Sequence, residues 1–302
     1  NGWRKDVRVS MLDPIAALLF SKYLSGLPFH TVSVGSEGGK EEEKLGIGMP
    51  TVIGDFGSGD RYISMVNDVI EGTTAATHNR MGAFSVLGAG TYMGIKPTPK
   101  DAKYMEKFFG PPEVAGKIGI DLPVQENLDR VRSVYGVTAA EITVVAMNRR
   151  ANEDIMHEVQ AFGARLHTIE AGDLMPSFLA LMSPHKNGRG VHLVMGRGGI
   201  EEGGIAAVAG RSLGSHVEGR EWASSSQDKD LPAPGGRVLT LDELVPGRRD
   251  QAFIAFTPIT DDPWFGFKGM KLHNGTAQGA SVILDQEGFH LQPFERPIEI
   301  KV

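Results

Sequence analysis

Apolar residues in the middle of the chain recur first with a helical period and then in runs typical of buried strands. Leu128, Val131 and Tyr135 share one helical face, and Gly136 follows as a helix stop. The next segments predict a strand at 142–147, a helix at 152–162 and a strand at 164–169. A helix that links two such strands indicates a β-α-β unit, whose strands run parallel.

Further elements are predicted on both sides of this unit. After it come a short helix at 178–182, a strand at 191–195, a glycine-rich loop at 196–202 and a helix of small residues at 205–213. Strands at 251–256 and 280–284 are expected to complete the C-terminal unit of the chain. The polar segment 224–236 is expected to form a lid-like loop. Before the unit, 32–34 and 62–66 have strand patterns, and Asp13-Pro14 is typical of a helix start.

These elements predict an α/β protein built of two units that divide near Gly119. The N-terminal unit, residues 1–118, mixes helix and strand in an α+β manner. The C-terminal unit, residues 119–302, alternates strand and helix. With 302 residues the chain is long enough to give each unit a substantial core.

Composition narrows the class of protein. The chain has no cysteine, which excludes disulfides and thiolate metal sites, and its net charge of −6 argues against nucleic acid as a partner. No apolar run approaches the roughly 20 residues that cross a bilayer, and no signal peptide is visible. We therefore expect a cytoplasmic protein without a membrane partner, and we expect a further stretch before Asn1.

The segment Asp68-Val69-Ile70-Glu71-Gly72-Thr73 carries the strongest chemical signal. Two carboxylates at the end of a predicted strand are followed by a glycine and a hydroxyl. Such hard oxygen ligands suit Mg²⁺ or Mn²⁺, the glycine lets a ligand approach the backbone, and Thr73 could orient an attacking water. The alternative is a capping turn in which Asp68 and Thr73 bond only backbone amides.

Two acidic positions earlier in the chain favour the metal interpretation. Asp13 lies at the predicted helix start, and Glu37 lies where the strand at 32–34 runs into a glycine- and acid-rich loop. With Asp68 and Glu71 they could form one carboxylate cluster.

The order and spacing of these motifs resemble the class II (bacterial) fructose-1,6-bisphosphatase family, with 24 residues separating Asp13 from Glu37. Lys103-Tyr104-Met105-Glu106-Lys107 is similar to the family's Tyr-Met-Glu-Lys segment. Gly196-Arg197-Gly198-Gly199-Ile200-Glu201-Glu202-Gly203 is similar to its glycine-rich loop that ends in Glu-Gly. The resemblance runs from Asp13 to about Thr260.

This resemblance implies the layered sugar-phosphatase fold that the family shares with lithium-sensitive inositol phosphatases. It implies a metal-dependent hydrolysis of a phosphosugar with Mg²⁺ or Mn²⁺, by a homo-oligomer, either a dimer or a tetramer. The implied metal ligands are Asp13, Glu37, Asp68, Glu71 and Glu202, and the implied catalytic residues are Thr73, Asp68 and Glu71. The implied substrate-binding residues are Glu71, Gly72, Thr73, Tyr104, Arg149, Arg150, Asp173 and Gly199.

The chain departs from the family pattern at its sugar-binding positions. Where the family has Lys/Arg-Pro-Arg this chain has Arg149-Arg150-Ala151, and the family's Asp-Gly-Asp becomes Ala171-Gly172-Asp173. Fructose 1,6-bisphosphate is the default substrate. A seven- or eight-carbon sugar phosphate or a cyclitol phosphate is the alternative, and a non-catalytic phosphosugar-binding protein is a remote one.

The glycine-rich stretch at 196–203 has two other interpretations. A dinucleotide site is not supported, because the glycine spacing differs from Gly-x-Gly-x-x-Gly and no acidic residue follows at the expected distance. Glu201 and Glu202 could instead merely favour the first turn of the next helix. For Glu201 we adopt this helical role, whereas for Glu202 we keep the metal-ligand role.

Overall fold

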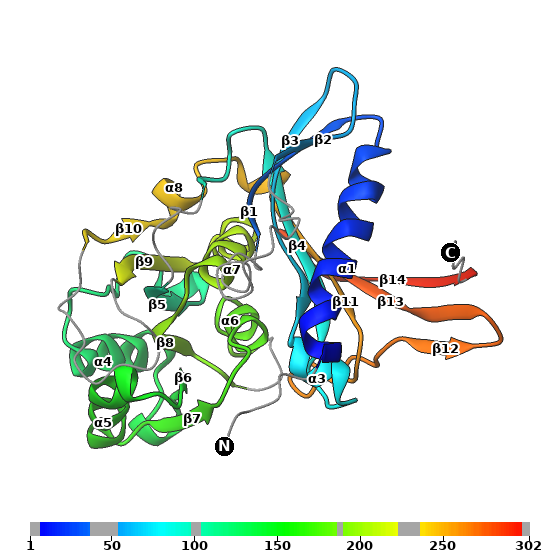
Figure 1. Cartoon of the computed structure of the whole chain (residues 1–302). Coiled ribbons are helices and arrows are strands. Elements are labelled where there is room, and N and C mark those ends of the chain that lie inside the picture. Colours follow the sequence, from blue (N-terminus) through cyan, green and yellow to red (C-terminus); the bar gives the residue numbers. More distant parts are fainter. Residues whose placement is uncertain (1–6, 37–53, 98–103, 186–189, 223–235, 298–302) are drawn as a thin grey trace.

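The computed structural model describes residues 7–36, 54–97, 104–185, 190–222 and 236–297, with side chains from residue 12 onward. These residues form two β-sheets that alternate with three layers of helix (Figure 1). The outer helices are α1 (Val7–Ser25) on one side and α4 (Val124–Tyr135) and α5 (Glu153–Phe162) on the other, and the inner ones are α6 (Leu174–Ala180) and α7 (Ile200–Leu213). The layering confirms the predicted α/β class.

The first sheet draws its strands from both ends of the sequence. Its order within the described residues is β12-β13-β11-β4-β3-β1-β2, and β14 pairs with β13. Only β1 and β3 run parallel, and the other pairs are antiparallel. The bounds are β1 (His30–Ser36), β2 (Gly54–Phe56), β3 (Tyr62–Glu71), β4 (Phe84–Thr91), β11 (Phe253–Pro258), β12 (Lys271–His273), β13 (Thr276–Asp285) and β14 (Gly288–Pro297).

The second sheet has the order β10-β9-β5-β8-β6-β7 in the described part of the chain. Strand β6 runs parallel to β7 and β8, and helix α5 connects β6 to β7. The bounds are β5 (Tyr104–Gly110), β6 (Thr143–Met147), β7 (Arg165–Ile169), β8 (Leu193–Gly199), β9 (His216–Trp222) and β10 (Leu239–Thr240). Short helices are α3 (Thr73–Thr77) and α8 (Leu241–Leu244), and 3-10 turns occur at Pro112–Val114, Ala139–Glu141, Arg150–Asn152 and Arg249–Gln251.

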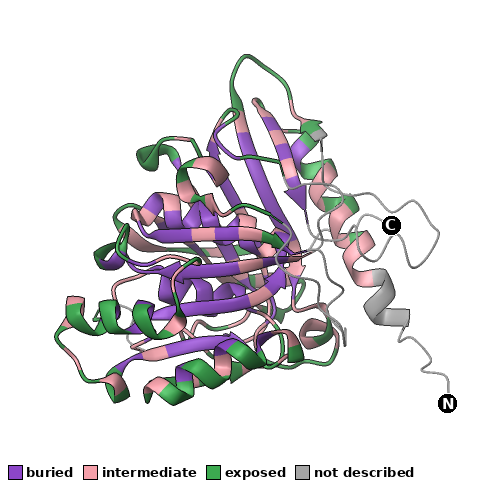
Figure 2. Ribbon diagram, turned by 90° about the vertical axis from the view of Figure 1, so that its left-hand side faces the viewer, coloured by how far each residue is buried: buried purple, intermediate pink, exposed green. Residues whose placement is uncertain are grey.

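The largest core lies between the sheets, around α6 and α7 (Figure 2). Helix α7 consists mainly of glycine, alanine and short aliphatic residues, so strands can approach it closely from both sides. On the first sheet, a Cβ at Gly88 would lie 3.1 Å from the Cβ of Val208. On the second sheet, a Cβ at Gly210 would lie 2.3 Å from a methyl group of Val217.

Most predicted elements in the middle of the chain are confirmed. The helix through Leu128 and Val131 is α4, which buries both residues and ends at Gly136 in the left-handed conformation, with φ 64°. The predicted β-α-β unit is β6, α5 and β7. The apolar spacing was enough to predict these helices, because each has one face on the sheet and one in solvent.

Three predictions about element bounds or placement are wrong. Helix α1 begins at Val7, so Asp13 lies inside it, and the helix continues through Pro14. The stretch 196–202 is not a loop, because β8 pairs with β5 as far as Gly199 and α7 begins at Ile200. The strands predicted at 251–256 and 280–284 are β11 and β13, which join the first sheet through β4 rather than the C-terminal unit.

The division into units 1–118 and 119–302 stays a prediction. Strand β5 precedes Gly119 and belongs to the second sheet, while β11 to β14 follow it and belong to the first. The predicted lid-like loop lies almost wholly outside the described residues. No helix in the described part of the chain is long and apolar enough to cross a membrane.

The packing of α7 predicts opposite effects for two glycine substitutions in this helix. Gly210→Ala would drive a methyl group into Val217 and should lower the free energy of unfolding by about 1–3 kcal/mol. Gly204→Ala is the matched control, since no atom lies within 4 Å of its Cβ position. It should leave stability unchanged or raise it by up to about 1 kcal/mol through helix propensity. Denaturant unfolding of both variants checks this, and equal stabilities would contradict the packing argument.

Candidate active site

Strand β3 carries Asp68 and Glu71 on the same face because of a β-bulge. Residues three apart in a regular strand point to opposite faces. Here Asp68 pairs with Val86 whereas Glu71 pairs with Phe84, so β3 has one residue more than β4 between these pairs. Val86 and Phe84 both belong to the core around α7. The bulge therefore turns both carboxylates toward that helix, and both are buried, with 4% and 7% of their surface exposed.

The turn after β3 holds Thr73 against Asp13. Gly72 has φ 77°, and a Cβ there would lie 3.0 Å from the carbonyl oxygen of Gly82, so glycine is required at this position. The Thr73 hydroxyl lies 2.9 Å from both carboxylate oxygens of Asp13 and 3.2 Å from the carbonyl oxygen of Ile70. Asp68 Oδ1 accepts the backbone N–H of Ile70 at 3.0 Å. The capping interpretation thus accounts for the bond of Asp68 Oδ1 to a backbone N–H. It does not account for the Thr73 hydroxyl, which is bound to the Asp13 carboxylate.

Helix α7 brings Glu202 to the same place. Glu202 lies in the first turn of the helix and folds back over Gly199, since a Cβ at Gly199 would lie only 1.8 Å from Glu202 Oε2. Glu201 lies in the same turn, as expected of an acidic residue near a helix N-terminus. We name Asp68, Glu71 and Glu202 the acidic cluster.

Glu71 is the electrostatic centre of this cluster. Its pKa is raised to about 7, mainly by burial. The nearby charges of Glu202 and Asp173 add to this rise, whereas a hydrogen bond with Asp68 and the charge of Lys107 oppose it. The same influences show that residues from β3, β5, α7 and the start of α6 converge here. The predicted metal ligands Glu71 and Glu202 therefore lie close to Asp173, which is predicted to bind the sugar.

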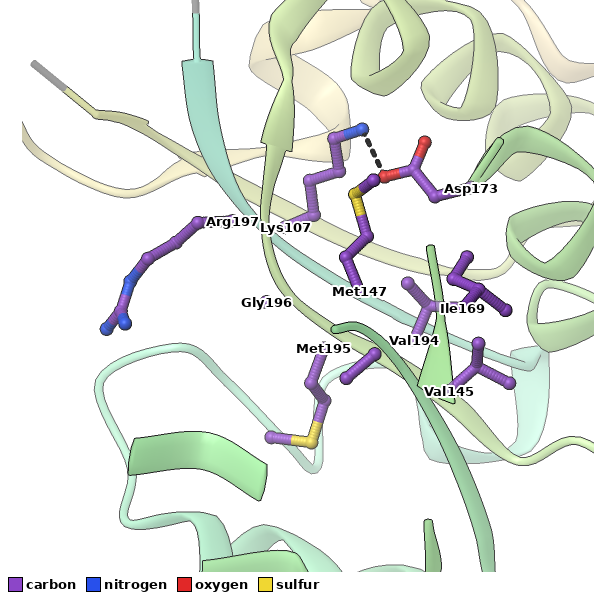
Figure 3. A pocket seen from close by; sticks show the side chains of 10 residues that line it. Lys107, Val145, Met147, Ile169, Asp173, Val194, Met195, Gly196 and Arg197 are labelled. Atoms are coloured by element: carbon purple, nitrogen blue, oxygen red, sulfur yellow. Dashed lines mark hydrogen bonds and ion pairs between the residues drawn. The ribbon is translucent and has the colours of Figure 1, made fainter. Parts of the chain in front are cut away.

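Lys107 is a site residue that the sequence reading missed. Its ammonium lies 2.7 Å from Asp173 Oδ2, and both side chains are buried, with 2% and 7% exposed (Figure 3). Together with apolar side chains of β6 and β8 they line a hollow beside Gly196. The available signal was a lysine inside a strand that continues as Phe108-Phe109, where a charge must have a partner.

The basic residues predicted to bind the sugar part of the substrate are less firmly held than Lys107. Arg149 is half-buried and Arg150 is exposed, and within the described residues neither forms an ion pair. The carbonyl of Ala151 instead accepts a hydrogen bond from Arg197. Arg197 is bound to Asp154 at 2.9 and 3.1 Å and to Glu106 at 3.3 Å.

Tyr104 lies at the end of β5, paired with Gly199 on β8 and with Trp222 on β9. Tyr104 and Gly199 are therefore neighbours, and their roles in substrate binding stay predictions. Glu37 lies outside the described residues, so its predicted ligand role stays a prediction.

The donor set of the acidic cluster fits a hard divalent cation. Buried carboxylates repel one another, and a cation would offset both that repulsion and the burial that raises the pKa of Glu71. Within the described residues, however, no three acidic or histidine side chains are arranged to hold one metal ion. The ligand roles of Asp13, Asp68, Glu71 and Glu202 therefore stay predictions, which rest on the chemistry of the carboxylates and, for Asp68 and Glu71, on their burial.

A model of the family described as bacterial fructose-1,6-bisphosphatase, glpX-encoded, matches residues 9–292. The chain belongs to this family. The match spans nearly all of both sheets and confirms the resemblance inferred from the motifs. Members of this class II family are metal-dependent phosphatases.

Curated relatives in cyanobacteria agree with this family. A protein of Gloeobacter violaceus named D-fructose 1,6-bisphosphatase class 2/sedoheptulose 1,7-bisphosphatase is 29% identical over 242 residues, which cover 74% of this chain and 67% of the relative. A protein of the same name from a Synechococcus species is 28% identical over 243 residues, with the same coverage. One from Prochlorococcus marinus is 28% identical over 235 residues, covering 72% and 67%.

The contact between Thr73 and Asp13 predicts a selective loss of turnover. Thr73→Ala removes the hydroxyl that would orient the attacking water and should lower kcat about 100-fold while changing KM by less than about 3-fold. Thr77→Ala, which removes a hydroxyl bound only to neighbouring groups of the same short helix, is the matched control and should retain activity. Steady-state kinetics on a phosphosugar checks this. A Thr73→Ala enzyme with wild-type kcat would restore the capping interpretation.

Proposed function

We propose that this protein is a metal-dependent sugar bisphosphatase, which hydrolyses a phosphomonoester of fructose 1,6-bisphosphate or a closely similar sugar and releases inorganic phosphate. Family membership supports the reaction. The observation that carries it is the proximity of the acidic cluster to Asp173 and Lys107. A Cβ at Gly172 would lie 3.4 Å from Glu71 Oε1, and the next residue, Asp173, is bound to Lys107 at 2.7 Å. A phosphoryl group and its sugar need such adjacent sites, one for metal and one for hydroxyl groups.

The metal would be Mg²⁺ or Mn²⁺, held by Asp13, Glu37, Asp68, Glu71 and Glu202. When bound, such a cation supplies neutralisation of the phosphoryl oxygens and activation of a water. Of these ligands, the described ones come from three elements, α1, β3 and α7. Ligands from so many separate elements hold a site rigidly, because each element is fixed by its own packing.

Thr73 and Asp13 would orient the attacking water. A hydroxyl has one hydrogen and two lone pairs. Since the Thr73 hydrogen is directed at the Asp13 carboxylate, its oxygen keeps lone pairs with which to accept a hydrogen from water. Thr73 thus fixes the direction of the water, and Asp13 fixes Thr73.

The sugar end would be formed by residues of both β5 and the second sheet's loops. Asp173 would accept hydroxyl hydrogens of the sugar, and the backbones of Gly72 and Gly199 would contact the phosphate. Tyr104 beside Gly199, with Arg149 and Arg150, would contact the remainder of the substrate. A cytoplasmic location and a dimeric or tetrameric assembly stay predictions.

The relatives do not favour a cyclitol or an eight-carbon substrate, since their names give fructose 1,6-bisphosphate and the seven-carbon sedoheptulose 1,7-bisphosphate. A non-catalytic phosphosugar-binding protein is also not favoured. None of the carboxylates Asp13, Glu37, Asp68 and Glu71 is missing from the sequence.

A phosphate-release assay tests the proposed function. Purified protein should release phosphate from fructose 1,6-bisphosphate and sedoheptulose 1,7-bisphosphate when Mg²⁺ or Mn²⁺ is present, and not from inositol 1-phosphate at a comparable rate. Excess chelator should abolish the release, and added metal should restore it, because the buried carboxylates need a counter-charge.

Two results would overturn parts of this proposal. Full activity in chelator would refute the metal mechanism. Binding of fructose 1,6-bisphosphate without any release would favour the non-catalytic alternative. Glu71→Gln is the internal control and should lose turnover, since it removes a charged ligand while keeping the size of the side chain.

The positions Ala151 and Ala171 predict a weak hold on the distal part of the substrate. Arg150 is exposed, and within the described residues no ion pair fixes its side chain, so it would hold a distal phosphate less firmly than an arginine at 151. The double change Ala151→Arg with Ala171→Asp should lower KM for fructose 1,6-bisphosphate by about 10- to 100-fold, because each group adds a charge-assisted hydrogen bond. Ala115→Arg, an exposed position away from the site, controls for added charge. An unchanged KM in the double variant would refute this account of the departures.

A further inference from the structure

Lys107 occupies an unusual position for a lysine. Its side chain has 2% of its surface exposed, and its ammonium is bound to Asp173 at 2.7 Å (Figure 3). The two residues come from different elements, β5 and the start of α6. Burial of an ion pair is costly, and removal of either partner alone leaves an uncompensated charge. Such a pair is weak evidence for stability and needs another explanation.

The charges around Lys107 give that explanation. The charges of Glu202 and Asp173 both act on Glu71, and the charge of Lys107 acts on Glu71 in the opposite sense. In the absence of this cation, repulsion by the acidic cluster would drive the Asp173 carboxylate away from the site. Lys107 thus counters the acidic cluster at the point where the sugar end begins.

The side chain of Asp173 is also free of the role that its position would suggest. Asp173 is the N-cap residue of α6, where an aspartate commonly accepts a backbone N–H of the first turn. Here its side chain makes no such capping bond. Oδ2 is held by Lys107, and no described residue donates a hydrogen bond to Oδ1.

Strand β8 leaves room for this arrangement. A Cβ at Gly198 would lie 2.7 Å from Asp173 Oδ2 and 3.1 Å from Lys107 Nζ. The glycine therefore lets the ion pair pack directly against the strand backbone. With a backbone on one side and the core on the other, the pair is held in one geometry.

We propose that Lys107 is a positioning residue for substrate binding, which fixes one oxygen of Asp173 so that the other can accept a hydrogen from a sugar hydroxyl. The proposal rests on the proposed function, because it assigns the sugar contact to Asp173. It also gives the strand lysine of the Tyr104 to Lys107 segment a task that the motif alone does not reveal. Lys107 acts through Asp173 and does not take part in the chemical step.

Equilibrium binding and kinetics of four variants test this proposal. The variants are Lys107→Met, Lys107→Arg, Asp173→Asn and the double Lys107→Met/Asp173→Asn, with Lys117→Met, an exposed lysine, as the matched control. Calorimetry measures the Kd of fructose 1,6-bisphosphate in excess chelator, where no turnover is expected, and steady-state assays with Mg²⁺ measure kcat and KM.

Lys107→Met should raise Kd and KM about 10- to 100-fold and lower kcat much less, since the lost contact holds the substrate before and during the reaction. Asp173→Asn should have a similar effect, and Lys107→Arg should recover part of the loss. The Kd of the double variant should not exceed the higher of the two single-variant Kd values, because both changes remove the same contact. Lys117→Met should bind normally.

Several outcomes would overturn the proposal. They are an unchanged Kd in Lys107→Met, losses in the double variant that multiply, or a fall in kcat without a change in KM. Should Lys107→Met fail to fold, Lys107→Arg and the double variant, which leaves no unpaired buried charge, still decide. A wild-type protein that binds but does not hydrolyse would refute the proposed function and leave the binding test of Lys107 intact.

Discussion

The structure depends on one constraint, which is that helix α7 must pack against two sheets at once. Gly88 on β4 lets that strand approach Val208 of α7 on one side, and Gly210 of α7 lets β9 approach on the other. Because both contacts are backbone-close, the first turn of α7 has little freedom, and Glu202 in that turn is brought to Asp68 and Glu71 on the first sheet. The same helix that completes the core therefore also sets the position of the acidic cluster. Stability and the site geometry have a common origin in the small side chains of α7.

The elements with a simple apolar period could be predicted from sequence, but their partners could not. The α4 helix and the β6-α5-β7 unit were correct because each buries one face against its immediate neighbour in the chain. Strands β11 and β13 had recognisable patterns as well, yet they pair with the first sheet through β4. The pattern of apolar residues shows that a strand has a buried face, but it does not show which sheet the strand joins. The start of α1 was misjudged because Pro14 is tolerated inside that helix.

The acidic motif shows a similar limit within the site. Asp68, Glu71, Gly72 and Thr73 were found from their chemistry, whereas the bulge that points both carboxylates to one face has no sequence signal. Lys107 was overlooked for a related reason. A lysine is normally interpreted as a solvated residue, and only the burial of its strand shows that it needs an anionic partner. Residue types identify candidate donors, and tertiary packing decides which of them meet.

The composition of the first sheet from both ends of the chain has a consequence for biosynthesis. The second sheet uses a contiguous stretch, from β5 to β10, and its strands emerge from the ribosome together. The first sheet cannot close until β11 pairs with β4, and the turn next to Gly72 is held by Gly82, whose N–H donates to the carbonyl of Asp261. A nascent chain thus carries an open edge on β4 until β11 has been translated. During that interval chaperones would have an exposed apolar strand to recognise.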